Sequence, residues 1–376
     1  MNIPIVVISH NNYKYVKNTL KQIKEINGDY YKNIIIMDNC STEPDTINYL
    51  QNIDVEVIFK KTNDFPQIDT NRNKDIYERL PDKFVVTDPD LQFNPNLPSN
   101  FIEVLSSLSD KYRCRKIGFA LDIFERDKIF KGSYFRNKTI VEWESQFWVA
   151  KISDPQYELY SASIDTTFCI LNKKFPGTEI RVAGNFLAKH IPWYIDNSIY
   201  NIYELYNSVY DKTSNISTTK KPFEMYLDTN YVKIQKNNDT YLLMNNTDNI
   251  NFWKNNYSTW ERETFQVFDK YLRNDKTVID IGSWIGTTAM YSSRRSKRVI
   301  CVEADEDSFA ELQRNMKDNC ENNYTLINKA IYNKDDIKIK FGKNKFLHNS
   351  KLNDSTSQIY NDNEIHTDCY VKDTIT

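Results

Sequence analysis

The sequence contains no uninterrupted apolar stretch of the roughly 20 residues that a membrane-spanning helix needs. Its first apolar run, residues 3–8, is shorter than the apolar region of a secretory signal peptide. The six cysteines include no C-x-x-C pair, and no histidine stands at zinc-finger spacing from them. We therefore expect no transmembrane segment, no zinc site and no disulfide framework, and we predict a cytoplasmic protein in a reducing compartment.

Glycine and proline are also scarce, with 8 and 11 residues in a chain of 376, which excludes collagen-like and linker-like chains. The 49 Lys and Arg residues nearly balance the 51 Asp and Glu residues, so we expect no basic surface for nucleic acid. Hydrophobic residues make up 40% of the chain, which is enough for packed cores. A chain of this length is expected to hold two or three domains.

Short apolar runs alternate with amphipathic segments over the first hundred residues. Four of these runs are typical of buried strands: residues 3–8, 34–37, 55–59 and 84–86. Val16, Leu20 and Ile23 recur at helical spacing between the first two runs. Residues 100–108 predict another helix, in which Glu103 stands where a capping box needs it. The alternation predicts a parallel sheet in an α/β domain.

Polar residues follow these predicted strands, at the edge of a parallel sheet where ligands gather. Ser9, Asp38 and Asp88 each stand at the end of a run, and Asp90 follows two residues after Asp88. Two carboxylates at this spacing could together hold Mg²⁺ or Mn²⁺, which would bridge to a diphosphate. Pro89 between them stiffens the turn. We therefore predict a substrate and metal site at this edge.

The order of these motifs resembles that of GT-A glycosyltransferases, especially the family 2-like enzymes. Three later segments add to the resemblance: residues 142–148, 164–168 and 190–194. Together they cover about residues 1–205. The resemblance implies a Rossmann-like, nucleotide-sugar-binding domain. It also implies transfer of a sugar from a nucleotide-sugar donor to a glycan or other hydroxyl acceptor, with Mn²⁺ or Mg²⁺.

The same resemblance suggests roles for individual residues. Asp38 would contact the nucleotide base, with Ser9 beside it at the substrate site. Asp88 and Asp90 would hold the metal on the sugar nucleotide. His190 would be a further metal ligand, although a structural histidine is the alternative interpretation.

Sugar transfer also requires a carboxylate that takes the proton of the acceptor hydroxyl. In inverting GT-A enzymes this base lies in sequence between the aspartate pair and the late histidine. Asp165 fits that order best, and Glu142 and Glu144 are the alternatives. The competing interpretation of Asp165 is an aspartate that caps a helix or a turn.

The composition turns polar near residue 207, and we predict a linker over residues 206–225 between domains at 1–205 and 226–376. A second strand–turn–helix pattern follows, with a glycine turn that would let a nucleoside approach the backbone. Trp284 occupies the middle glycine position of a dinucleotide fingerprint. S-adenosylmethionine has no pyrophosphate, so it fits this turn better than a dinucleotide does.

The second half closely resembles the FkbM-type methyltransferases that use S-adenosylmethionine. The stretches that carry the resemblance are residues 252–265, 280–286 and 302–315. It implies that Asp280, Gly282, Ser283 and Gly286 line the methionine side of the cofactor, and that Glu303 holds the ribose.

The residues after Glu303 are too few for a complete methyltransferase sheet, so we expect an incomplete Rossmann-like domain with an uncovered sheet edge. A protein partner that completes the edge, a split or truncated gene, and a decayed domain are the explanations left open. Alternatively, the C-terminal half is a non-catalytic binding or docking module beside an active glycosyltransferase.

Overall fold

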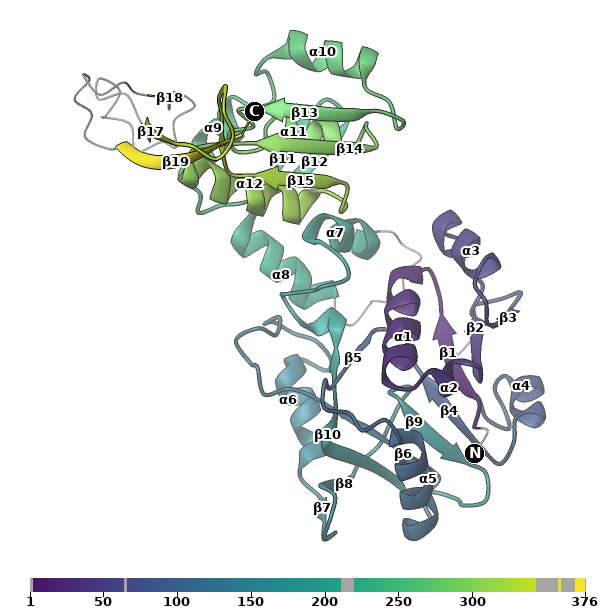
Figure 1. The fold of residues 1–376 in the computed structure, drawn as a ribbon. Helices are drawn as coiled ribbons and strands as arrows, with labels where there is room; N and C mark the ends of the chain where they lie inside the picture. Colours follow the sequence, from purple (N-terminus) through teal and green to yellow (C-terminus); the bar gives the residue numbers. More distant parts are fainter. Residues whose placement is uncertain (1–2, 64–65, 211–219, 343–357, 360–368, 376) are drawn as a thin grey trace. The chain divides into compact units, whose positions relative to one another are not determined.

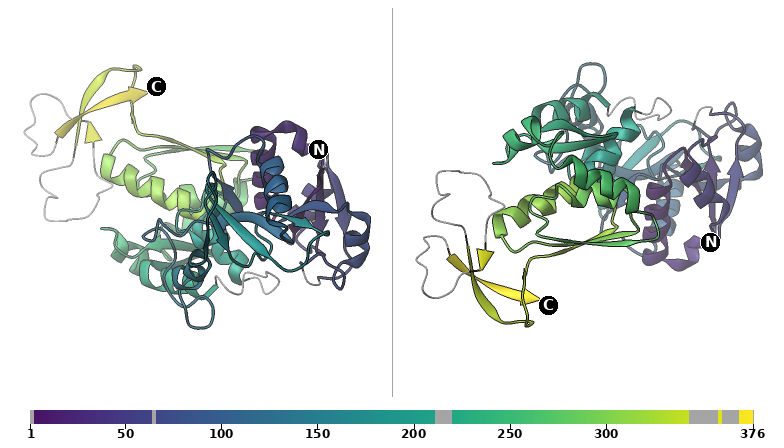
Figure 2. Two further views of the ribbon diagram at one scale, coloured as in Figure 1. Left: turned by 90° about the horizontal axis from the view of Figure 1, so that it is seen from below. Right: turned by 90° about the horizontal axis from the view of Figure 1, so that it is seen from above.

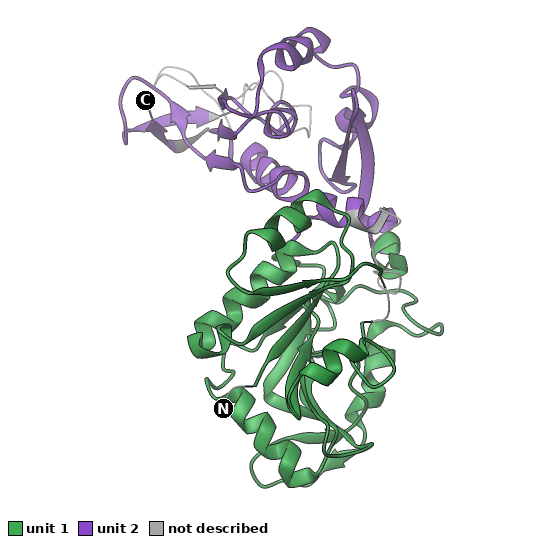
Figure 3. Cartoon of the chain, turned by 90° about the vertical axis from the view of Figure 1, so that its right-hand side faces the viewer, with its two compact units in different colours: residues 1–199, 211–225 green, residues 200–210, 226–376 purple. Residues whose placement is uncertain are grey.

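The structure is a computed structural model that describes residues 3–63, 66–210, 220–342, 358–359 and 369–375. The chain divides into two compact units, coloured separately in Figure 3. Unit 1 comprises Met1–Ile199 and Asp211–Met225, and unit 2 comprises Tyr200–Tyr210 and Tyr226–Thr376. The predicted α/β class is confirmed, since helices and strands alternate along the chain.

Unit 1 is built on a mixed ten-stranded sheet, visible in Figure 1. The strand order is β3-β2-β1-β4-β9-β6-β10-β8-β7, and β5 pairs with β10. The strands are β1 (Ile5–Ser9), β2 (Ile34–Asp38), β3 (Glu56–Phe59), β4 (Lys83–Thr87), β5 (Leu91–Phe93), β6 (Lys116–Leu121), β7 (Lys151–Ile152), β8 (Leu159–Ser161), β9 (Cys169–Asn172) and β10 (Glu179–His190).

The predicted parallel sheet is confirmed for β3, β2, β1 and β4, which lie parallel to one another. All residues of β1 are buried, as expected for an inner strand of a parallel sheet. The rest of the sheet is mixed, because β9 runs antiparallel to both β4 and β6. This reversal brings the segment that precedes β9 to the carboxyl end of β4.

Helices cover the sheet of unit 1, and α1 buries Val16, Leu20 and Ile23 as the helical spacing predicts. The helices are α1 (Tyr13–Ile26), α2 (Gly28–Tyr31), α3 (Pro44–Gln51), α4 (Lys74–Arg79), α5 (Phe101–Tyr112) and α6 (Ile140–Glu144), with the 3-10 helices η1 (Ser145–Trp148) and η2 (Ile191–Trp193).

The capping box predicted at the start of α5 is wrong. Asn100 makes no side-chain cap hydrogen bond, and the Glu103 carboxylate accepts a hydrogen bond from the Tyr30 hydroxyl. Tyr30 packs edge-on against Phe101, with ring centroids 5.3 Å apart, which brings its hydroxyl to Glu103. A tertiary contact therefore replaces the local one.

Unit 2 contains three small sheets: β11-β12, β13-β14-β15 and β16-β19-β17-β18. Its strands are β11 (Tyr231–Lys236), β12 (Asp239–Met244), β13 (Thr277–Ile281), β14 (Arg298–Val302), β15 (Tyr324–Ile327), β16 (Ala330–Ile331), β17 (Lys338–Gly342), β18 (Gln358–Ile359) and β19 (Cys369–Ile375). The remaining helices are α7 (Ile202–Tyr210), α8 (Lys220–Asn230), α9 (Ile250–Asn255), α10 (Arg262–Tyr271), α11 (Ala289–Ser293) and α12 (Glu306–Asn319). Among the helices of the described segments, none has both the length and the apolar character to cross a bilayer.

Part of the predicted linker, residues 206–225, is helical, because it includes the end of α7 and the start of α8. Leu205 in α7 is buried, as are Phe223 and Leu227, which stand four residues apart in α8. The polar composition hid these apolar positions, whose spacing gives a helix one buried face. The middle of the predicted linker, residues 211–219, lies outside the described residues.

The parallel sheet β13-β14-β15 has one well-packed face. Leu312 and Met316 of α12 belong to the same buried apolar cluster as Val299 of β14, and α12 lies beside these strands in Figure 1 and again in Figure 2. Ile279 and Ile281 of β13 are each 64% exposed, and no described strand pairs with the outer edge of β13. Parallel sheets are normally buried on both faces, so the described part of unit 2 presents an open edge and an apolar face.

Candidate functional site

The two strand ends nearest the middle of the parallel sheet carry Ser9 and Asp38, which are register partners across β1 and β2. Both side chains are buried. The Ser9 hydroxyl donates to Oδ1 of Asn12 at 3.0 Å, and Asp38 accepts from the backbone amide of Ser41 at 3.0 Å. Both residues thus shape the turns after their strands. Their predicted contacts with a nucleotide-sugar donor stay predictions.

Asp90 and His190 lie side by side although a hundred residues separate them in the sequence. β5 and β10 pair antiparallel with His190 opposite Leu91, and the Ile191 amide donates to the Asp90 carbonyl at 2.9 Å. As a result, Nε2 of His190 lies 3.3 Å from Oδ2 of Asp90. The structure therefore brings together two of the three predicted metal ligands.

Asp88, the third predicted ligand, shares this negatively charged environment. Burial and the neighbouring Asp90 carboxylate raise the pKa of Asp88 to about 7. Burial alone would lower the pKa of His190, but the carboxylates of Asp90, Asp88 and Glu144 outweigh it and raise that pKa. The carboxylates of this cluster therefore favour a positive charge beside them, which a cation would also supply.

Two buried polar atoms of this cluster have no hydrogen-bond partner among the described residues: Oδ1 of Asp90 and Nδ1 of His190. Buried polar atoms are normally satisfied, and a carboxylate oxygen with an imidazole nitrogen suits Mn²⁺. Within the described segments, no three His, Cys, Asp or Glu side chains are grouped to hold a metal by themselves. Because Nε2 of His190 faces Asp90, a cation between the two side chains would take Nε2 and an Asp90 oxygen, with its other ligands from water and substrate phosphates, as Mg²⁺ commonly does.

Thr166 connects Asp88 to the segment before β9. The Asp88 amide donates to the Thr166 carbonyl at 2.8 Å, and the Thr166 hydroxyl donates to Oδ2 of Asp88. Thr166 lies within residues 164–168, which carry part of the resemblance, but its contact with Asp88 could not be predicted, because that contact depends on the reversed direction of β9.

Asp165 stands next to Thr166 and is exposed. It lines a small cavity of about 40 Å³ together with Gln67 and Lys116, and Nε2 of Gln67 lies 3.5 Å from its Oδ1. Its charge also contributes to the raised pKa of Asp88. The two carboxylates therefore interact through space.

The alternative bases, Glu142 and Glu144, are committed to local structure. Glu142 completes a capping box with Thr139, and hydrogen bonds from Thr139 lower its pKa. Glu144 forms an ion pair with Arg181, and the two side chains are only 3% and 5% exposed. Burial raises the pKa of Glu144, while Arg181 opposes that shift. Of the three candidates, Asp165 alone has an exposed carboxylate outside a cap and an ion pair.

Two side chains that we did not single out support the aspartate turn from α1. The Thr19 hydroxyl donates to the Pro89 carbonyl at 2.5 Å. Gln22 donates to the Leu91 carbonyl at 2.9 Å and accepts from the Phe93 amide at 2.8 Å. Both are buried polar residues on the core-facing side of a helix. That position is a signal that sequence reasoning could have used.

The predicted glycine turn of unit 2 follows β13. The amides of Gly282 and Ser283 donate to the Val302 carbonyl at 2.9 and 3.2 Å, which holds the turn against the end of β14. Gly282 has φ 71° and Gly286 has φ 92°, in the left-handed region that favours glycine. Apart from its two chain neighbours, no atom of the described residues lies within 4 Å of where a Cβ on Gly282 would stand, so the backbone there is open to a ligand.

The acidic residues of this second site are both held locally. The Glu303 carboxylate accepts from the amides of Trp284 at 2.8 Å and Asp305 at 2.7 Å. Oδ2 of Asp280 accepts from the Thr288 hydroxyl at 2.7 Å. Burial raises the pKa of Asp280 and of Glu303. The five predicted cofactor residues therefore gather at the ends of β13 and β14.

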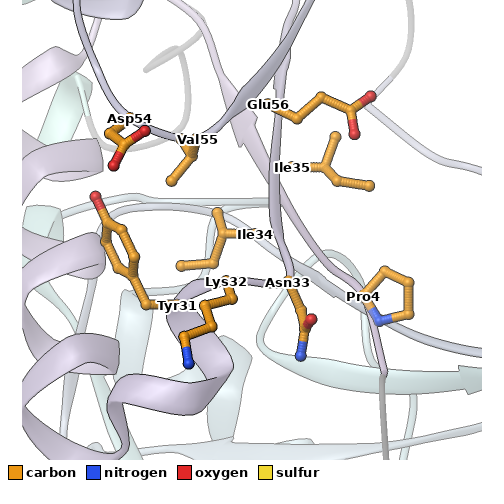
Figure 4. Close-up of a pocket in the computed structure, with 9 residues that line it drawn as sticks. All are labelled: Pro4, Tyr31, Lys32, Asn33, Ile34, Ile35, Asp54, Val55 and Glu56. Atoms are coloured by element: carbon orange, nitrogen blue, oxygen red, sulfur yellow. The ribbon is translucent and has the colours of Figure 1, made fainter.

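A larger cavity of about 270 Å³ lies at the amino end of β2, shown in Figure 4. Its charged residues include Lys32 and Glu56, which pair with Asp29 at 3.1 Å and with Arg79 at 2.7 Å. It is at the opposite end of the strands from Asp38, away from the carboxylates described above. We assign no function to it.

Comparison with known proteins agrees with the α/β, Rossmann-like arrangement of unit 1. Residues 5–175, slightly less than half of the chain, match the family model described as glycosyl transferase family 2. The match includes Ser9, Asp38, Asp88, Asp90 and Asp165, and it ends before His190. No curated protein matches the sequence.

Solved structures resemble the chain only in part. A Pyrococcus horikoshii protein is 18% identical over 27% of this chain and 37% of that one, with a TM-score of 0.20. A mannosyltransferase from Pyrobaculum calidifontis, solved with GDP-Man and Mn²⁺, is 12% identical over 33% of this chain and 36% of that one, with a TM-score of 0.26. Trm5b from Pyrococcus abyssi is 14% identical over 58% of this chain and 85% of that one, with a TM-score of 0.19. The chain spans little more than a third of the length of the first two proteins.

Proposed function

We propose that unit 1 is a metal-dependent glycosyltransferase that moves a sugar from a nucleotide-sugar donor to an acceptor hydroxyl. The observation that carries this proposal is the pairing of Asp90 with His190 beside the buried carboxyl of Asp88. The family match of residues 5–175 supports the same class of reaction.

The donor would lie across the carboxyl ends of β1, β2 and β4. Asp38 and Ser9 would meet the nucleoside, and Asp88 would face the donor beside the metal. Asp90 and His190 would hold Mn²⁺ or Mg²⁺, which when bound neutralises the charge that develops on the leaving diphosphate.

The reaction requires one proton acceptor from the protein. In our proposal, Asp165 takes the proton from the acceptor hydroxyl while the oxygen of that hydroxyl bonds to the anomeric carbon of the donor sugar. The bond from that carbon to the diphosphate oxygen breaks, and its electron pair leaves with the diphosphate. A single displacement of this kind inverts the anomeric configuration, which NMR of the glycoside product would measure.

The test is turnover of a panel of nucleotide sugars by the full chain, with and without Mn²⁺. We expect Mn²⁺-dependent release of nucleoside diphosphate from one donor, reduced at least about 100-fold in Asp90→Asn. Asp29→Asn, which changes an exposed carboxylate in the same unit, is the matched control.

A donor panel can also fail because the acceptor is missing. Calorimetric binding of nucleoside diphosphate with Mn²⁺ separates that case from a wrong assignment. Binding that is present in wild type and weakened in Asp90→Asn supports the site, whereas metal-independent binding, or none, contradicts it.

For unit 2 we propose a second function, binding of S-adenosylmethionine at the turn after β13. The open backbone at Gly282 and the strand-end carboxylate of Glu303 favour a nucleoside ligand. Calorimetry with S-adenosylmethionine, using Glu303→Gln as the variant, tests this. Absence of binding would favour the alternative, a docking module whose partner completes the open edge at β13.

A further inference from the structure

The segment that carries Asp165 is held by charged side chains in its middle, while single backbone bonds hold Ala162, Thr166 and Phe168. β8 ends at Ser161 and β9 begins at Cys169, so residues 162–168 cross between them outside the named strands. Side chains from the first residue of β6 and from the start of β10 bond to consecutive backbone groups of this segment. Hydrogen bonds with a charged partner are stronger than neutral ones, so these side chains can hold an irregular backbone in one conformation.

The contacts fall on three neighbouring residues. Nζ of Lys116 donates to the carbonyl of Ile164 at 2.6 Å and to the carbonyl of Asp165 at 3.0 Å. Oε2 of Glu179 accepts from the Ile164 amide at 2.6 Å. Nε of Arg181 donates to the Ser163 carbonyl at 2.8 Å.

The three side chains are themselves fixed. Nζ of Lys116 lies 3.8 Å from Oε1 of Glu179, and these side chains are 16% and 21% exposed. Arg181 is buried in its ion pair with Glu144 and lies over the Phe147 ring, 4.1 Å from its centroid. Their positions therefore follow from the packing of β6, β10 and α6.

We propose that Lys116, Glu179 and Arg181 are positioning residues that hold Asp165 in the geometry of the reaction. This inference depends on the proposed function, because it gives Asp165 the role of base. Lys116 carries the most weight, since its ammonium group bonds to the carbonyl of Asp165 itself. A base displaced by about 1 Å loses on the order of 100-fold in rate while donor binding persists.

The chain offers a matched control for Lys116. Lys83 is also the first residue of an inner strand of the same sheet and is 15% exposed. Its Nζ donates to the Ser106 carbonyl at 3.1 Å and lies 2.5 Å from Asp110. Lys83→Met therefore removes a similar carbonyl–carboxylate contact without touching the Asp165 segment.

The experiment compares Lys116→Met, Lys116→Arg and Lys83→Met by steady-state kinetics and by hydrogen exchange of the apo protein. We expect kcat to fall about 10- to 100-fold in Lys116→Met with donor KM within about twofold, and partial recovery in Lys116→Arg. Exchange over residues 162–168 should increase in Lys116→Met and stay at the wild-type rate in Lys83→Met.

Equal losses in Lys116→Met and Lys83→Met, or unchanged exchange over residues 162–168, would overturn the inference. If Lys116→Met does not fold, Glu179→Met probes the same segment through the Ile164 amide. If wild type turns over no donor and binds no nucleoside diphosphate with Mn²⁺, the proposed function fails, and exchange alone still decides whether the three side chains hold the segment.

Discussion

The hydroxyl of Thr166 donates a hydrogen bond to the carboxylate of Asp88, while the carbonyl of Thr166 accepts from the Asp88 amide at 2.8 Å. The two segments of the candidate site are therefore joined at both backbone and side chain.

Removing this hydroxyl should weaken the site without unfolding it. We expect Thr166→Val to reduce the affinity for nucleoside diphosphate with Mn²⁺ by about 10-fold or more, because the bond to a charged partner is lost. Calorimetric titration measures the affinity, and Thr166→Ser, which keeps the donor, should stay near wild type. Equal affinity in both variants would contradict a role for the hydroxyl.

The ion pair between Glu144 and Arg181 should contribute strongly to the stability of unit 1, because both side chains are nearly inaccessible. Arg181→Met leaves the Glu144 carboxylate buried without its partner and should cost about 3–5 kcal/mol. The double variant Glu144→Leu with Arg181→Met should cost less than the two single variants added together. Urea unfolding of the four proteins gives the comparison, and strict additivity would count against the pair.

Asp318 should make the stability of unit 2 depend on pH. Burial raises its pKa from 3.8 to about 6, although the Tyr231 hydroxyl donates to its Oδ2 at 3.0 Å. Because the folded pKa exceeds the unfolded one, the stabilisation is complete below about pH 4 and is lost as the pH rises through about 6.

Asp318→Asn should therefore unfold at a similar urea concentration to wild type at about pH 4. It should be more stable by about 3 kcal/mol near pH 7, where wild type keeps a buried charge. Asn retains an acceptor for the Tyr231 hydroxyl. A difference between the two proteins that does not change with pH would show that Asp318 ionises normally.

Gly118 should tolerate no side chain. A Cβ at this position would lie 2.2 Å from the Phe168 carbonyl oxygen and 2.4 Å from Cβ of Cys169, so β6 and β9 would have to separate. We expect Gly118→Ala to lower the melting temperature by several degrees or more. Gly28→Ala, where no atom lies within 4 Å of the new Cβ, is the control and should stay near wild type.

Much of unit 1 follows from local sequence pattern. β1, β2 and β4 are apolar runs because a parallel strand that is covered on both faces has no solvent-exposed face for polar side chains. The reversed β9 could not be predicted, since its residues are as apolar as those of the parallel strands. Helices α7 and α8 were missed because few apolar positions lie within a polar stretch.

The candidate site divides in a similar way. Asp88 and Asp90 were found because they follow an apolar run directly, and the pairing of β5 with β10 brings His190 to them. Lys116 and Arg181 were missed because a cation at the start of a strand is ordinary in sequence. Lys116 bonds to carbonyls 48 and 49 residues later in the chain, and Arg181 bonds to a carbonyl 18 residues earlier. Both contacts depend on how the segment before β9 crosses the sheet.

The long connection between β6 and β8 has a consequence for how the proposed glycosyltransferase could change its acceptor. Both ends of the excursion between β6 and β8, residues 122–158, are anchored in the sheet, while the carboxylates of the site belong to neighbouring elements. This excursion carries the partly exposed aromatic residues Phe124, Trp143 and Trp148. Exchanges within it that spare Glu144, the buried partner of Arg181, would leave the framework around Asp88 and Asp165 in place. Under the proposed function, acceptor preference could then diverge while donor chemistry is kept.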